Sequence, residues 1–161
     1  MPTYDSILLE GEPKGKRIEG YISGSTPKPG TVMQLKAATE PVNGRHSWEV
    51  YNRDADGNRP QGALAILLED HLQGKDDDDA YADGDRCFLY VPAPGDELRM
   101  LVANIAGTGD SFAIGDLLIV NDGDGKLIAT TGSVESEPFT VMETVAALTA
   151  DTLVHCMFTG Y

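Results

Sequence analysis

The chain turns at Pro27-Lys28-Pro29-Gly30 and continues directly into Thr31-Val32-Met33-Gln34-Leu35, and this pairing of a tight turn with an extended apolar run decides its fold. The pairing recurs where Pro92-Ala93-Pro94-Gly95 leads into a second such run, and again where Gly115-Asp116 leads into Leu117-Leu118-Ile119-Val120. Proline fixes φ and glycine supplies a positive φ, so each turn reverses the chain ahead of a strand. The pattern therefore predicts a compact protein that is mainly β.

Strand signals continue along the rest of the chain at regular intervals. Residues 97–102 alternate between charged and apolar side chains, as a strand does when it buries one face. Asn121-Asp122-Gly123-Asp124-Gly125 separates two apolar runs, which is typical of a β-hairpin. About eight to ten short strands of this kind favour a β-barrel or a β-sandwich with little helix. Residues 143–150 fit either a strand or a short helix, since Ala146-Ala147-Leu148 favours helix.

The sequence predicts one domain, residues 18–161, preceded by an N-terminal arm, residues 1–17. A chain of 161 residues is long enough for one domain with a buried core. Within residues 1–17 the apolar run is Ile7-Leu8-Leu9, and the segment that follows it is polar and rich in glycine. Such a segment is typical of an arm that is mobile or laid on a partner, and it also fits a short edge strand.

The net charge of −14 limits the partners that this protein can bind. A strongly acidic surface repels nucleic acids and anionic membranes, so we expect neither as a partner. The chain begins without the basic and apolar regions of a signal peptide, and its apolar runs are too short to cross a bilayer. Cys87 and Cys156 both lie in apolar runs, where cysteine behaves as a small buried hydrophobe, although a bridge between neighbouring strands stays open.

Two acidic segments are weak candidates for a metal site. Asp54, Asp56 and Asn58 have the oxygen spacing that opens a calcium loop. The match then fails, because Arg59 and Ala65 stand where the loop needs glycine and a bidentate glutamate. In the second segment, residues 76–85, six acids lie within ten residues, which indicates a solvated loop or a cation site.

The sequence lacks the motifs of the common enzyme classes. It contains no phosphate-binding Gly-Lys-Ser/Thr, no complete dinucleotide fingerprint and no Gly-x-Ser-x-Gly elbow. His46, His71 and His155 have no zinc-ligand spacing, and neither cysteine belongs to a C-x-x-C motif. We therefore expect a protein that is not an enzyme and that uses no cofactor.

The order of the turns resembles that of the head decoration (cement) proteins of tailed bacteriophages. The resemblance covers residues 18–160, and the chain departs from it in a long segment at 38–59 and in the acidic run at 76–79. The phrases that carry it, in chain order, are Pro29-Gly30, Tyr81-x-x-Gly84-Asp85, Pro94-Gly95-Asp96-Glu97, Gly115-Asp116-x-Leu118, Gly123-Asp124-Gly125-Lys126-Leu127, a strand with Glu143, and the closing strand 153–158.

The resemblance implies a structural role on the exterior of a virion, after synthesis in the host cytoplasm. Proteins of this family bind the outside of an assembled capsid, often as homotrimers, and bridge subunits of the major capsid protein. The N-terminal arm is then the expected contact. Its apolar residues Ile7, Leu8 and Leu9 would fill a groove or add a strand on the capsid, and its basic residues would pair with capsid acids. Those basic residues are Lys14, Lys16 and Arg17.

Two other readings stay open at this stage. The turn-rich β pattern also fits another virion component, such as a part of the tail or the connector. Alternatively, the acidic loops would belong to a small enzyme or to a binding module that calcium stabilises, which a shift of the melting temperature with calcium would reveal.

Overall fold

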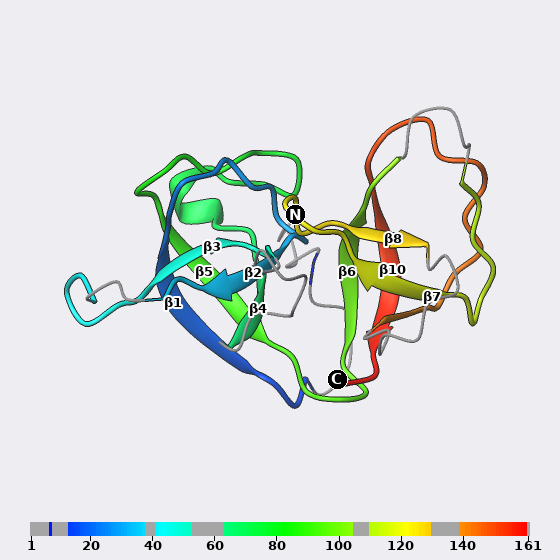
Figure 1. The fold of residues 1–161 in the computed structure, drawn as a ribbon, viewed down its shortest axis with the longest axis horizontal. Coiled ribbons are helices and arrows are strands. Elements are labelled where there is room, and N and C mark those ends of the chain that lie inside the picture. Colours follow the sequence, from blue (N-terminus) through cyan, green and yellow to red (C-terminus); the bar gives the residue numbers. More distant parts are fainter. Residues whose placement is uncertain are drawn as a thin grey trace.

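The computed structural model describes residues 7, 13–37, 41–52, 63–104, 110–129 and 139–160 (Figure 1). Within these residues the mainly β class with little helix is confirmed, since the one helix is a short 3₁₀ turn, η1 (His71–Gln73). No helix in the described ranges has the length and apolar character needed to span a membrane. The strands are β1 (Lys16–Ile22), β2 (Val32–Leu35), β3 (Ser47–Val50), β4 (Leu64–Leu67), β5 (Arg86–Val91), β6 (Glu97–Val102), β7 (Leu117–Val120), β8 (Leu127–Ala129), β9 (Phe139–Val141) and β10 (Thr152–Phe158).

The strands form two closed five-stranded barrels, which lie side by side in Figure 1. Barrel 1 contains β1 to β5 and barrel 2 contains β6 to β10. In each barrel the first strand pairs in parallel with the third, and every other neighbouring pair is antiparallel. The two barrels therefore have the same topology. The sequence pattern did not reveal that the chain is divided into two barrels.

The strand registers of the two barrels are also equivalent. In barrel 1 the backbone N–H of Gly30 donates to Leu67 O at 2.8 Å, and Leu67 N–H donates to Thr31 O at 3.0 Å. In barrel 2 Gly115 N–H donates to Val141 O at 2.9 Å, and Val141 N–H donates to Asp116 O at 2.8 Å. The cross-strand row Val32, Ile66 and Tyr90 accordingly corresponds to the row Leu117, Thr140 and Met157. Each barrel is thus one copy of a repeated structural unit.

A four-residue turn, Ala-x-Gly-Asp, precedes three of the strands. In each case the aspartate side chain accepts a hydrogen bond at 2.8 Å from the alanine N–H three residues earlier. The glycine has a positive φ, between 84° and 96°, which a residue with a Cβ adopts only at a cost. The sequence predicted a chain reversal at the turns 93–96 and 113–116, whereas residues 82–85 were expected only as part of an acidic loop before a strand.

The buried apolar side chains form two clusters. One fills barrel 1 and includes Trp48, Leu67 and Leu89. The other fills barrel 2 and continues onto the outer surface of barrel 1, through Val32 and Ile66. The barrels are therefore packed against each other by apolar contact. Residues 143–150 contain no helix, and Val145 forms an isolated bridge with Phe112.

Candidate interaction surfaces

A backbone segment of barrel 1 ties the two barrels together. Residues 30–32 lie between β6 and β8, where Leu101 N–H donates to Gly30 O at 3.0 Å and Val32 N–H donates to Gly125 O at 2.8 Å. Between the equivalent strands of barrel 1, β1 and β3, no segment intervenes, and Tyr21 N–H donates directly to His46 O at 3.1 Å. The first barrel thus supplies backbone groups that barrel 2 needs to close this gap.

The carboxylate of Asp96 is the second link between the barrels. It accepts hydrogen bonds from the Tyr90 hydroxyl at 2.6 Å and from the N–H groups of Lys14 at 2.8 Å, Gly15 at 3.0 Å and Ala93 at 2.8 Å. Burial favours the neutral acid, but these four donors outweigh it and hold the pKa of Asp96 below its ordinary value. Burial and the neighbouring carboxylate raise the pKa of Tyr90. Asp96 is therefore ionised and joins the N-terminal segment, β5 and β6.

The structure places Ile7 in the core of this chain. Its side chain is fully buried, its N–H donates to Glu69 Oε1 at 2.9 Å, and its carbonyl accepts from Arg99 N–H at 2.7 Å. Ile7 thus contacts barrel 1 and barrel 2 of its own molecule. Leu8 and Leu9, the other two apolar residues expected to meet a partner, lie outside the described residues.

The three basic residues expected to meet a partner are all exposed. Lys14 donates its backbone N–H to Asp96, which fixes the start of the segment. Lys16 and Arg17 are the first two residues of β1 and are paired with β5, so the barrel begins two residues before the boundary that the sequence suggested. Their contact with a partner stays a prediction.

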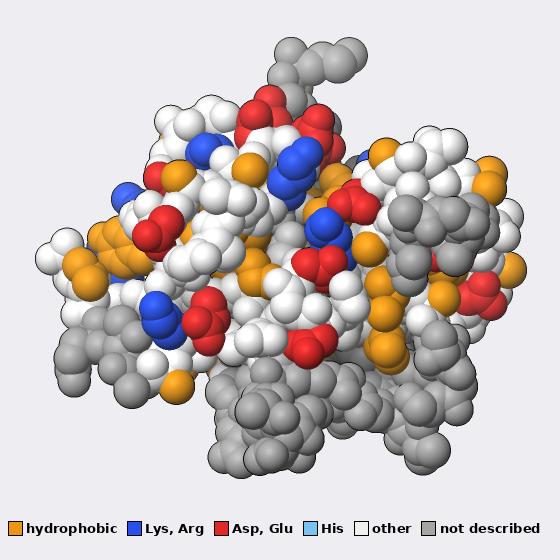
Figure 2. Space-filling model, turned by 45° about the horizontal axis from the view of Figure 1, so that its top comes forward, with side chains coloured by type: hydrophobic (Ala, Val, Ile, Leu, Met, Phe, Trp, Pro, Cys, Tyr) orange, Lys and Arg blue, Asp and Glu red, His pale blue; other side chains and the backbone are white. Residues whose placement is uncertain are grey.

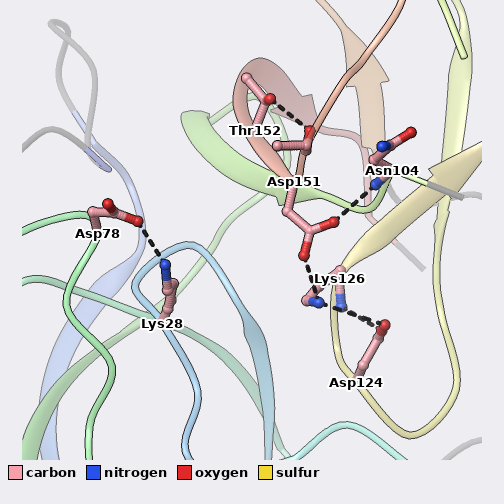
Figure 3. Close-up of polar contacts among 8 residues, drawn as sticks. Lys28, Asp78, Asn104, Asp124, Lys126, Asp151 and Thr152 are labelled. Atoms are coloured by element: carbon pink, nitrogen blue, oxygen red, sulfur yellow. Dashed lines mark hydrogen bonds and ion pairs between the residues drawn. The ribbon is translucent and has the colours of Figure 1, made fainter. Parts of the chain in front are cut away.

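A hollow of about 590 Å³ lies between the barrels and is lined by both of them. Basic and acidic side chains gather along it in Figure 2, and Figure 3 shows how the lysines are paired. Lys28 Nζ lies 2.6 Å from Asp78 Oδ1, and Lys126 Nζ lies 2.7 Å from Asp151 Oδ2. The hydrogen bond to Asp78 raises the pKa of Lys28 and lowers the pKa of Asp78. Each ion pair thus lies within one barrel, and the attraction between Lys28 and Asp151 is the charge interaction that acts across the hollow.

Asp151 is the carboxylate that pairs with Lys126 in the hollow, and its hydrogen bonds favour its charged form. Partial burial favours its neutral form, yet the hydrogen bonds from Lys126 and from the backbone N–H of Asn104, at 2.9 Å, keep its pKa below the ordinary value. Both lysines of the hollow therefore already have a carboxylate partner.

The acidic loop before β5 is held by nearby bases. Asp78 pairs with Lys28, and His71 Nδ1 lies 2.8 Å from Asp76 Oδ1. Among the residues that the structure describes, no group of three or more histidines, cysteines, aspartates or glutamates is placed to hold a metal ion. Asp54, Asp56 and Asn58, the weak calcium candidates, lie outside the described residues, so that prediction is untested.

Part of the outside of barrel 2, at β7 and β8, is apolar, and sequence analysis did not identify it. Ile114, in the turn before β7, is 66% exposed, and Leu117, the first residue of β7, is 44% exposed. Ile119 of β7 and Ile128 of β8 face each other across the two strands and are half-buried. We call these four residues the β7–β8 face.

Sequence analysis also missed the role of Asp96 at the junction of the barrels, although its Ala-x-Gly-Asp turn was a usable signal.

No protein-family model matches this chain, and no curated protein matches it. Among solved structures, a similar one is described as the crystal structure of head fiber gp8.5 N base in bacteriophage phi29. The match has a TM-score of 0.51 and 10% sequence identity, and it covers 90% of this chain and 94% of that chain. At this identity the likeness shows a shared fold, which extends over both barrels.

Proposed function

We propose that this protein is a non-enzymatic structural component of a phage head, which binds the outside of the capsid and stabilises it as a decoration protein. The observation that carries the proposal is the fold, shared over 90% of the chain with a protein described as a head fiber base of bacteriophage phi29. The resemblance of the ordered turns to head decoration proteins points the same way. The major capsid protein is the proposed partner.

The architecture suits a passive contact protein. Two backbone hydrogen bonds, the Asp96 carboxylate and a shared apolar cluster join the barrels into one body. A body of this kind transmits force between the surfaces that it binds. When many copies bind one shell, moderate individual contacts add up to a large total through multivalency. The acidic surface also suits a place outside the capsid, away from packaged DNA.

The test is co-sedimentation of the purified chain with expanded heads that lack it. Deletion of residues 1–17 is unsuitable as a variant, because it would remove Ile7 and two of the donors to Asp96. Instead, Lys16→Glu probes the exposed basic residues, and Lys36→Glu makes the same charge change at a half-buried lysine of barrel 1, whose Nζ donates to Ser23 Oγ at 2.7 Å. Lys36→Glu serves as the control once thermal unfolding shows that it is folded. We expect the wild type to pellet with heads in proportion to capsid subunits, and Lys16→Glu to bind more weakly than Lys36→Glu.

Three results would count against this function. A chain that stays in the supernatant at every ratio to heads would refute head binding. A small copy number set by a symmetric connector would favour a tail or connector component. Equal binding by Lys16→Glu and Lys36→Glu would remove the basic residues from the contact while leaving head binding intact.

A further inference from the structure

We propose that the β7–β8 face of barrel 2 binds a second copy of this chain. This inference does not depend on the proposed function, because it concerns how copies of the protein associate. The face consists of Ile114, Leu117, Ile119 and Ile128. Exposed apolar side chains gathered on one sheet face are typical of a contact surface, whereas single exposed ones are not.

In barrel 1 the strand face equivalent to the β7–β8 face is buried against the other barrel. In barrel 1 the equivalent outward row is Val32, Ile66 and Tyr90, whose exposed fractions are 0%, 1% and 2%. These side chains belong to the apolar cluster shared with barrel 2, so the neighbouring barrel buries them. Leu117 occupies the position of Val32 in barrel 2 and is 44% exposed. The other two residues of this row, Thr140 and Met157, are half-buried, so the strand face is an interface in one barrel and partly uncovered in the other.

The composition of the face points in the same direction. The next outward pair in barrel 1 is Gln34 and Glu49, joined by a hydrogen bond of 2.8 Å. Barrel 2 has Ile119 and Ile128 at the equivalent positions. An antiparallel sheet with one solvated face normally carries polar residues on that face. The core of barrel 2 does not require the two isoleucines, because Leu118 and the other inward residues fill it.

A second copy is the occupant that the contact between the barrels supports. Within the chain, a barrel of the same fold covers the equivalent face. The side of barrel 2 that does so presents Leu101 and Leu153. Their barrel 1 equivalents are Tyr21 and Arg86, and Arg86 is bound to Glu19 at 2.8 Å. A head-to-tail chain of barrels would therefore place the apolar face against an ion pair where barrel 2 offers a leucine.

Face-to-face association is the arrangement that remains. An isologous contact places the same patch of both copies together, so an apolar centre meets an apolar centre. The pair His155 and Glu97 and the neighbouring Arg99 lie on β10 and β6, the strands of barrel 2 that do not border β7, so they stay outside this contact.

Sedimentation equilibrium of the full chain tests the inference. The informative variants are Leu117→Lys and Ile114→Lys, which place a charge in the face. The control is Leu72→Lys, because Leu72 is 95% exposed on barrel 1 and equally apolar. We expect the wild type to associate, both face variants to raise the dissociation constant about tenfold or more, and the control to leave it unchanged. Higher salt should strengthen association, because it screens the repulsion between chains of net charge −14.

The inference is overturned by either of two results. One is a wild-type chain that stays monomeric at every concentration and salt level, which would leave the face to a different partner. The other is an oligomer that Leu117→Lys and Ile114→Lys do not weaken. Thermal unfolding of each variant checks that the fold is retained, and Leu117→Thr provides a milder change if Leu117→Lys unfolds.

Discussion

The Tyr90 hydroxyl donates a hydrogen bond to the Asp96 carboxylate at 2.6 Å, at the point where the last strand of barrel 1 passes into the first strand of barrel 2. Asp96 is only 4% exposed and also accepts three backbone hydrogen bonds. Because two of those donors, Lys14 and Gly15, precede β1, one carboxylate holds together the start, the middle and the second half of the fold.

Replacement of Asp96 by alanine should therefore be costly. The change leaves a tyrosine hydroxyl and three backbone N–H groups without their acceptor in a buried place. We expect Asp96→Ala to lower the free energy of unfolding by about 3 kcal/mol, since hydrogen bonds to a charged group contribute more than neutral ones. Urea denaturation followed by circular dichroism measures this loss.

Asp116→Ala is the matched control for Asp96→Ala. Asp116 occupies the same Ala-x-Gly-Asp turn and accepts the same alanine N–H, at 2.8 Å, but it is exposed. Water can replace its carboxylate, so we expect a loss of at most about 1 kcal/mol. Equal losses at the two positions would show that the turn, rather than the junction of the barrels, accounts for the effect of Asp96.

The contribution of Asp96 should also depend on pH. Its four donors hold the pKa of the folded carboxyl below the ordinary value of about 3.9, which applies to the unfolded chain. The unfolded state then binds the proton first, so the stabilisation is fully present above the unfolded pKa and is lost as the pH falls through the folded pKa. We expect the difference in unfolding free energy between wild type and Asp96→Asn to shrink below about pH 4. Urea titrations across this range would contradict the idea if the difference stayed constant.

Local residue chemistry predicted the turns but not the pairing of the strands. The reversal at Gly95-Asp96 follows from a glycine with positive φ and an aspartate that bonds its own backbone. The division into two barrels depends on partners far apart in sequence, such as the parallel pair β1 and β3. Nothing in a strand's own residues specifies which other strand lies beside it, so the repeat became visible only in the register.

The surfaces were harder to predict for a related reason. Ile7 was expected to meet a partner, yet Glu69 and Arg99 supply hydrogen bonds that hold it within its own chain. An apolar residue in a polar segment shows that something covers it and does not show what. Leu117-Leu118-Ile119-Val120 is apolar on both faces, so its pattern does not distinguish the inward Leu118 from the exposed Leu117.

Gly125 should resist substitution more strongly than its neighbour Gly123. Both have a positive φ, 64° and 84°, so alanine is strained at either position. A Cβ on Gly125 would lie 2.4 Å from Val32 O, whereas a Cβ on Gly123 meets nothing within 4 Å. We expect Gly123→Ala to cost about 1 kcal/mol and Gly125→Ala at least about 2 kcal/mol more, because the second change also pushes the barrels apart. Similar unfolding midpoints for the two variants would contradict a tight junction at Gly125.

The two cysteines should be unreactive until the protein unfolds. Cys87 lies in the core of barrel 1 and Cys156 in the core of barrel 2, both fully buried and unpaired with each other. Burial raises the pKa of each thiol to about 12, and the thiolate is the form that reacts. We expect Ellman's reagent to modify neither thiol in the native protein at about pH 8, and both in denaturant.

Single variants assign the reactivity to one barrel or the other. Cys87→Ala leaves the thiol of barrel 2, and Cys156→Ala leaves the thiol of barrel 1, so the modification rate of each variant reports the opening of one barrel. Since the two barrels share an apolar cluster and the Asp96 junction, we expect similar protection of both thiols in mild denaturant. Rapid labelling of one thiol in the native protein would show that its barrel opens independently, and the junction would then not couple the two halves.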